Sequence, residues 1–99
     1  MDRLFHLNGL QFVWDEDKAA SNQHKHGVAF ENACEVFLDP LLQFQDATVA
    51  GESRQAVISL TLSRRLLFVV HVELGSDFIR LVSARQASND ERFKYEDNA

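Results

Sequence analysis

Apolar and polar residues in the second half of the chain follow the two-residue period of β-strands. The pattern predicts four strands, over residues 41–46, 55–62, 66–74 and 78–84. The third strand is apolar on both faces until His71, so we expect it at the centre of a sheet. Gly75-Ser76 predicts a tight hairpin turn between the last two strands. The four strands together indicate an antiparallel meander.

The first half of the chain predicts a short strand and two helices. Residues 10–14 are the strand candidate, whereas residues 1–9 show no clear pattern. Asp15 is a good N-cap and Gly27 a typical stop for a first helix that is polar almost all round. The second helix ends before Pro40, because the residue preceding a proline resists the helical conformation. Four apolar residues share one face of this second helix: Phe30, Ala33, Cys34 and Phe37.

A short helix closes the chain. Ser88-Asn89-Asp90-Glu91 is a capping box, with a serine N-cap and a glutamate three residues later, and it predicts a helix over residues 89–96. The elements follow one another as β-α-α-β-β-β-β-α. We therefore expect one α+β domain spanning residues 1–99. It has a short N-terminal strand and two helices, an antiparallel β-meander sheet with helices against one face, and a short C-terminal helix.

Composition limits the class of protein. A chain of 99 residues with 45% hydrophobic and 25% charged residues is one globular domain. It has no apolar run long enough to span a membrane and no secretory signal pattern at its N-terminus. A single cysteine favours a reducing compartment, so we expect the protein in the cytoplasm.

Charge is distributed unevenly along the chain. Residues 1–50 hold three Lys or Arg and eight acidic residues, whereas residues 51–99 hold seven of each, six of the seven bases being Arg. Guanidinium groups bind phosphate well because they donate two parallel hydrogen bonds. The net charge of −5 argues against a non-specific nucleic-acid coat, but it leaves room for a small basic site.

A series of short motifs runs along the chain in a characteristic order. They are Phe12-Val13-Trp14-Asp15 with Lys18 and Asn22, then Lys25-His26-Gly27-Val28 followed by Phe30-Glu31, then Arg54, Ser83-Ala84-Arg85, Glu91-Arg92 and Tyr95-Glu96. In this order and spacing the sequence resembles the BrnT-type toxins of bacterial type II toxin–antitoxin modules, over residues 12–96. The resemblance implies a compact relative of the RelE ribonuclease fold. It also implies a metal-independent ribonuclease that inhibits translation and is silenced by a cognate antitoxin, typically a ribbon-helix-helix DNA-binding protein.

Cleavage of RNA without a metal needs a base for the ribose 2′-OH, an acid for the leaving 5′-oxygen and cations for the charged phosphorane. Attack by the 2′-OH then gives a 2′,3′-cyclic phosphate and a free 5′-OH. Histidine titrates near neutral pH and can serve as acid or base. We predict four catalytic residues: His26, His71, Arg80 and Arg85. We predict three substrate-binding residues: Lys25, Arg54 and Tyr95.

Each candidate also has a structural interpretation. Lys25 and His26 suit the negative end of the first helix. A histidine on an apolar strand, such as His71, is more often a core residue, and Arg85 could pair with Glu91. Whether Arg80 shares a face with His71 depends on strand register. A metal site built from His24, His26 and His71 is disfavoured, because residues two apart do not share a helix face; we expect no metal and no cofactor.

A second function class is a binding module. The same fold with a weakened site would serve as the partner, or co-repressor, of a DNA-binding antitoxin. The acidic net charge, and Gln86 where a lysine is common after the Ser-Ala-Arg motif, favour this alternative. In either class we expect an antitoxin complex, as a dimer or a toxin–antitoxin heterotetramer, and no membrane association.

Overall fold

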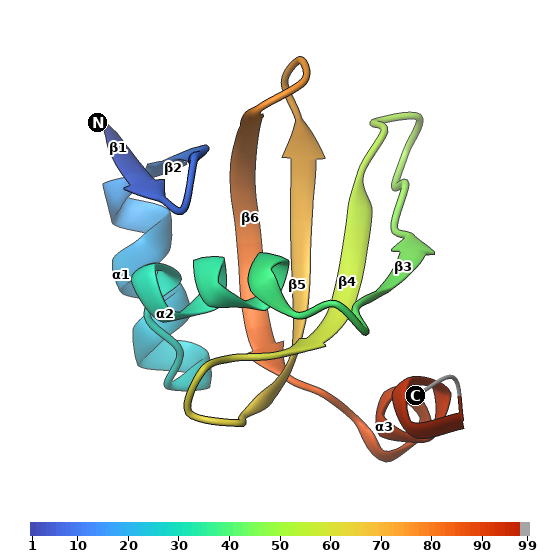
Figure 1. The fold of residues 1–99 in the computed structure, drawn as a ribbon. Coiled ribbons are helices and arrows are strands. Elements are labelled where there is room, and N and C mark those ends of the chain that lie inside the picture. The colour runs from blue at the N-terminus through green and yellow to red at the C-terminus, as the bar shows by residue number, and fades with distance from the viewer. Residues whose placement is uncertain (98–99) are drawn as a thin grey trace.

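A six-stranded mixed sheet organises the chain, as Figure 1 shows for the computed structural model, which describes residues 1–97. The strands are β1 (Asp2–Leu7), β2 (Leu10–Asp15), β3 (Gln43–Asp46), β4 (Gln55–Leu60), β5 (Leu66–Glu73) and β6 (Phe78–Gln86). They lie side by side in the order β1-β2-β6-β5-β4-β3. The helices are α1 (Glu16–His26), α2 (Phe30–Ala33), the 3₁₀ helix η1 (Cys34–Leu38) and α3 (Asn89–Asp97).

The expected meander is confirmed for strands β3 to β6, which pair antiparallel in sequence order with β5 between β4 and β6. The pairing of the N-terminal strand was not predicted, and β2 runs parallel to β6, which makes the sheet mixed. Parallel neighbours need a long crossover between them, and here it contains α1, α2, η1 and three strands. A local pattern cannot indicate such a distant pairing.

Residues 1–9, for which the sequence shows no clear pattern, form the edge strand β1 and its turn into β2. Asn8 and Gly9 make that turn with positive φ angles of 52° and 85°. An Asn-Gly pair is a strong signal for a two-residue hairpin. The strand itself is mostly exposed, which is why its hydrophobic pattern is faint.

Helix α1 has the predicted caps. The Asp15 side chain accepts a hydrogen bond from the Lys18 backbone N–H, and Gly27 ends the helix at a φ of 69°. Asn22 is the buried residue of this helix. Its amide side chain donates to the carbonyls of Val28 and Ala84 and accepts from the Ala84 N–H, so it ties α1 to the free edge of β6.

The predicted single helix over residues 30–39 is divided into α2 and η1. In a regular α-helix the Val36 carbonyl would accept from residue 40, but Pro40 has no N–H to donate. The Val36 carbonyl instead accepts from the Ser59 hydroxyl on β4 at 2.6 Å. This contact fixes η1 against the sheet, with Phe30, Cys34 and Val36 in the main core.

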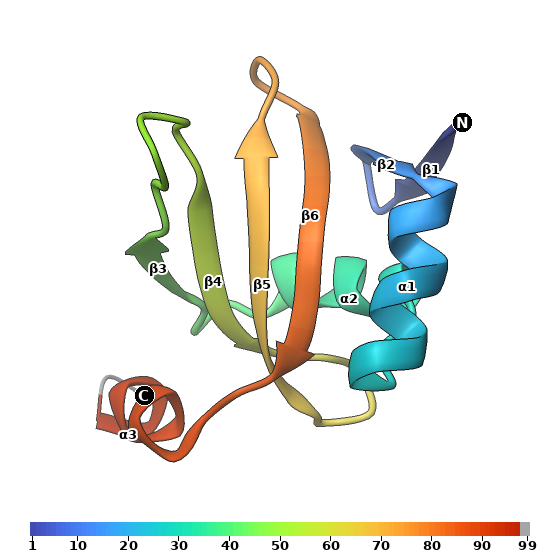
Figure 2. The same ribbon diagram turned by 180° about the vertical axis from the view of Figure 1, so that it is seen from behind.

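Helices cover both faces of the sheet, which corrects the expectation of one covered face. The α2 face of β4–β6 carries Val57, Leu67 and Val69, packed under α2 and η1. The α3 face carries Ile58 and Phe68, which pack with Tyr95 of α3. Figure 2 shows that α3 lies at one end of this second face, while no helix crosses the other end of β4, β5 and β6.

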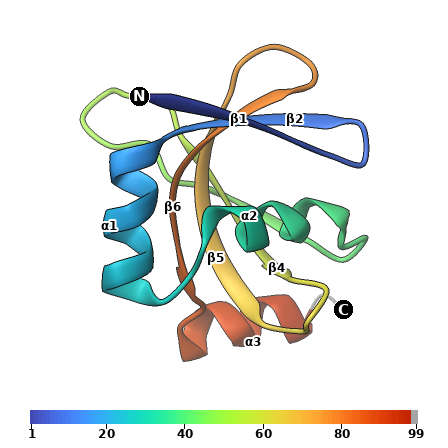
Figure 3. The same cartoon turned by 90° about the vertical axis from the view of Figure 1, so that its left-hand side faces the viewer.

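Figure 3 shows β1 and β2 crossing one end of the sheet, with α1 beside β6. No helix within residues 1–97 is long and apolar enough to cross a membrane.

Candidate functional site

Strand register places three predicted arginines on the α3 face. Arg85 pairs with Phe68 and Arg80 pairs with Val72, and residues paired across strands point to the same face. Arg54 directly precedes β4, and its carbonyl accepts from Ala47, so the β3–β4 pairing continues through it. With Val72 it lines a shallow hollow of about 280 Å³. The register that the sequence left open therefore brings Arg54, Arg80 and Arg85 to one side of the sheet.

Each of these arginines already has a carboxylate partner. The distances between nitrogen and oxygen are 3.2 Å for Arg54 and Glu52, 2.9 Å for Arg80 and Asp2, and 2.8 Å for Arg85 and Glu91. The Nε atom of Arg54 is buried and has no hydrogen-bond partner among the described residues. A phosphate on this face would share or displace the carboxylates.

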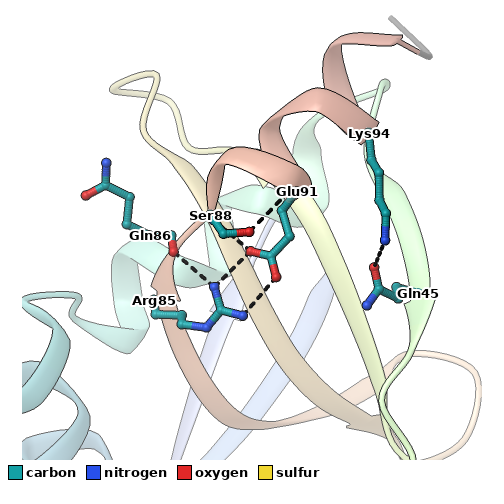
Figure 4. A network of polar contacts seen from close by, with 6 residues as sticks. All are labelled: Gln45, Arg85, Gln86, Ser88, Glu91 and Lys94. Atoms are coloured by element: carbon teal, nitrogen blue, oxygen red, sulfur yellow. Dashed lines mark hydrogen bonds and ion pairs between the residues drawn. The ribbon is translucent and has the colours of Figure 1, made fainter.

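Arg85 is the most firmly held of the three (Figure 4). Its two terminal nitrogens donate to both Glu91 oxygens at 2.8 Å, and its guanidinium lies 4.3 Å from the centre of the Phe68 ring. Glu91 also accepts from the Ser88 N–H, while its own N–H donates to the Ser88 hydroxyl, so the predicted capping box is confirmed. Burial opposes the ionised form of Glu91, but hydrogen bonds from Arg85 and Ser88 outweigh it and lower the pKa of that carboxyl.

His71 faces the opposite side from the arginines. It lies on the α2 face with no solvent exposure, and its ring meets the edge of Phe37 at 5.0 Å between centroids. Neither ring nitrogen has a hydrogen-bond partner within residues 1–97. Burial lowers the pKa of His71 and favours the neutral ring. His71, predicted as a catalytic residue, therefore lies in the core and away from the arginine side.

Tyr95 is also enclosed. The residue is 6% exposed, and its hydroxyl donates to Asp39 at 2.6 Å. Burial and the Asp39 carboxylate raise the pKa of Tyr95 to about 12. Tyr95 thus holds α3 against the sheet, and its ring has no open face on which a base could stack.

Lys25 and His26 lie at the edge of the arginine side. They line a hollow of about 220 Å³ between α1 and β6. Its walls are Lys18, Ser21, Asn22, Lys25, His26, Val82 and Ser83. Ser83 pairs with Val70, so its side chain belongs to the same face as the arginines. This α1–β6 groove and the α3 face are therefore continuous through Ser83.

Sequence reasoning did not single out Lys18 as a candidate, although it lines this groove. Lys18 and Lys25 are seven residues apart, which places them two turns apart on the same side of a helix. That spacing was the available signal. The strand that completes the groove could not be known from the sequence alone.

The three histidines of the rejected metal site are separated by the fold. His24 and His26 are exposed on α1, whereas His71 is in the core. Among residues 1–97, no group of three or more His, Cys, Asp or Glu side chains is placed to hold a metal ion.

Comparison with known proteins identifies the family. The model of the ribonuclease toxin BrnT of type II toxin–antitoxin systems matches residues 14–91. The crystal structure of the Brucella abortus ribonuclease toxin BrnT superposes with a TM-score of 0.58 and 27% sequence identity, covering 77% of this chain and 94% of that chain. No curated protein sequence matches significantly. Membership in a type II toxin–antitoxin family implies a cognate antitoxin as partner. The chain belongs to the BrnT family of ribonuclease toxins.

Proposed function

We propose that this toxin is an endoribonuclease that cuts RNA without a metal and thereby inhibits translation. The observation that carries the proposal is the continuity of the α1–β6 groove with the α3 face. It brings an exposed histidine, His26, to the edge of a surface that carries three arginines. Acid–base chemistry beside fixed cations is what cleavage by the ribose 2′-OH requires.

His26 is the candidate acid–base group, because His71 is enclosed in the core. In this scheme His26 takes the proton of the 2′-OH, whose oxygen bonds to phosphorus while the bond to the 5′-oxygen breaks. The neighbouring Lys25 ammonium supplies the proton to the leaving oxygen. Arg80 stabilises the charged phosphorane, and Arg54 adds a phosphate contact. Arg85 positions the surface through Glu91.

The test is cleavage of a labelled RNA in the presence of EDTA. We expect cleavage to persist, to give 2′,3′-cyclic phosphate ends by mass spectrometry, and to weaken as salt rises, because phosphate contacts release counterions. His26→Gln should slow cleavage about 100-fold, the lower end for loss of an acid–base group. His24→Gln, a neighbouring exposed histidine outside the groove, should not. Activity lost in EDTA and restored by Zn²⁺ would overturn the proposal. A cell-free translation reaction tests the proposed block directly.

The antitoxin is proposed to be a ribbon-helix-helix DNA-binding protein in a heterotetramer with the toxin. We expect it to cover the groove and the arginine side, with an interface of roughly 1,200–2,000 Å² or more. Solution scattering and a footprint of the complex test both statements. A complex that leaves Lys25, His26 and Arg80 open would contradict neutralisation by occlusion.

A second candidate function is a catalytically weak partner of the antitoxin. The observation that favours it is that the three arginines all hold carboxylates of the same chain. Induced expression distinguishes the two functions, since an active toxin arrests growth and a binding module does not.

A further inference from the structure

We infer that the Lys18 end of the α1–β6 groove is a second phosphate subsite, in which Lys18 binds the RNA backbone phosphate next to the one at which cleavage is proposed. The inference rests on the proposed ribonuclease function and extends it. Its ligand is a phosphodiester of single-stranded RNA, and Lys18 is the new substrate-binding residue.

Helix geometry aligns the cationic wall of the groove. Lys18, Ser21, Asn22 and Lys25 are spaced i, i+3, i+4 and i+7 along α1, so they form one stripe on the helix. Asn22, in the middle of the stripe, is held by Ala84 and Val28. This clamp fixes the distance between the helix and the strand, and the two lysines flank it.

The cations of the groove are available, in contrast to the arginines. Lys18, Lys25 and His26 are exposed, and within residues 1–97 their side chains make no hydrogen bond or ion pair. None of the seven lining residues is acidic. Asp15, which caps α1, interacts electrostatically with Lys18 from outside this lining. The lining itself is thus a local positive site on a chain of net charge −5.

The strand side of the groove is a β-bulge. Leu81 pairs with His71 and Ser83 pairs with Val70, so β6 has one extra residue, Val82, opposite β5. A bulge leaves the extra residue outside the ladder and bends the strand. Strand β2 covers the same edge of β6 only from Phe78 to Arg80, so the bulge lies at the open stretch that faces α1.

Ser83 gives the RNA strand a continuous path. Its side chain shares the sheet face with Arg80 and Arg85 and also lines the groove. A backbone that crosses β6 at Ser83 therefore passes from the arginines to the lysines. Consecutive phosphates of the RNA would then contact cations on both sides of β6.

The test is binding of an RNA that cannot be cleaved. The probe is a short fluorescein-labelled single strand with a 2′-O-methyl group on every ribose, and its affinity for the full chain is measured by anisotropy over a range of salt concentrations. Lys18→Gln should raise the Kd about 3- to 10-fold and reduce the salt slope by about 0.7, the loss of one phosphate contact. Lys18→Arg should restore both values.

Lys94→Gln is the matched control, since it removes the same charge from α3, where the side chain contacts Gln45 of β3 (Figure 4). Equal weakening by both Gln variants, unchanged binding in Lys18→Gln, or no binding of the probe to the wild-type chain would overturn the subsite. So would a Lys18→Gln variant that binds RNA normally but loses the antitoxin. Cleavage of unmodified RNA tests the proposed function separately. If the wild type cleaves RNA and Lys18→Gln binds the probe normally, only the subsite is rejected. If Lys18→Gln weakens binding as expected but the wild type does not cleave RNA, only the proposed ribonuclease activity is rejected.

Discussion

Arg80 of β6 and Asp2 of β1 form a two-point ion pair across 78 residues of sequence. The guanidinium donates to both carboxylate oxygens, at 2.9 and 3.4 Å. The hydrogen bond lowers the pKa of Asp2 and raises that of Arg80, so both groups are charged at neutral pH. Asp2 precedes the segment that matches the BrnT family, residues 14–91. The N-terminal hairpin of this chain thus places a carboxylate on the arginine that we propose as a phosphate ligand.

Asp2→Asn should strengthen RNA binding. Exposed ion pairs are weak, so we expect the Kd of the uncleavable probe to fall by at most about fivefold. Asp97→Asn on α3 removes the same charge and controls for the change in net charge. An Asp2→Asn variant with wild-type affinity, or with the same gain as Asp97→Asn, would show that Asp2 does not compete with phosphate.

His71 should make the fold sensitive to mild acid. Because burial lowers its pKa in the folded chain, the unfolded chain takes up the proton first as the pH falls past about 6.5. Stability is full above that value and decreases below it. We expect the free energy of unfolding to drop by about 1 kcal/mol between pH 7.5 and 5.5. Urea titrations should show this loss in the wild type and in His24→Gln, and His71→Leu should abolish it. If the free energy of unfolding of His71→Leu still falls between pH 7.5 and 5.5, groups other than His71 cause the loss of stability.

Arg85→Lys should destabilise the protein. The lysine keeps the charge but loses the two-point contact with Glu91 and the stacking over Phe68, at a cost of about 1–2 kcal/mol. For a domain of this size the Tm should fall by roughly 4–12 °C. Arg92→Lys, on the exposed side of the same helix, is the control. Wild-type melting combined with a large loss of cleavage would instead make Arg85 a phosphate ligand.

Asn22→Ala should be among the most damaging single changes on α1. It leaves the buried N–H and C=O of Ala84 and the carbonyl of Val28 without their partner, which should cost about 2–3 kcal/mol. Denaturant unfolding measures the loss, and Gln23→Ala provides an exposed neighbour on the same helix. Equal stability of the two variants would show that another group replaces the Asn22 contacts.

Local signals predicted the local structure well. Asp15, Gly27 and Ser88 mark helix ends, and the structure shows their caps or left-handed conformation. The alternation of apolar and polar residues predicted β4, β5 and β6. Their order in the sheet follows the sequence, because each strand pairs with the next along the chain.

The candidate site depended on distant pairings that a single sequence does not display. His71 and Arg80 both lie in strands whose apolar and polar residues alternate. Only the register of β5 against β6 shows that the two side chains lie on opposite faces of the sheet. The carboxylates that hold Arg80 and Arg85 come from the first residues of the chain and from its last helix. The groove beside Lys18 exists because α1 packs on a strand that follows it by more than fifty residues.

The reactivity of the single cysteine can be used to measure how often the main core opens. Cys34 begins η1, has no solvent exposure, and burial raises the pKa of its thiol far above the neutral range. A thiol reagent needs the exposed thiolate, so it reacts with the folded chain only when η1 leaves the sheet. Labelling rates would therefore measure how often the α2 side opens while the rest of the molecule stays folded. An antitoxin that rigidifies this layer would slow the labelling without touching the sulfur.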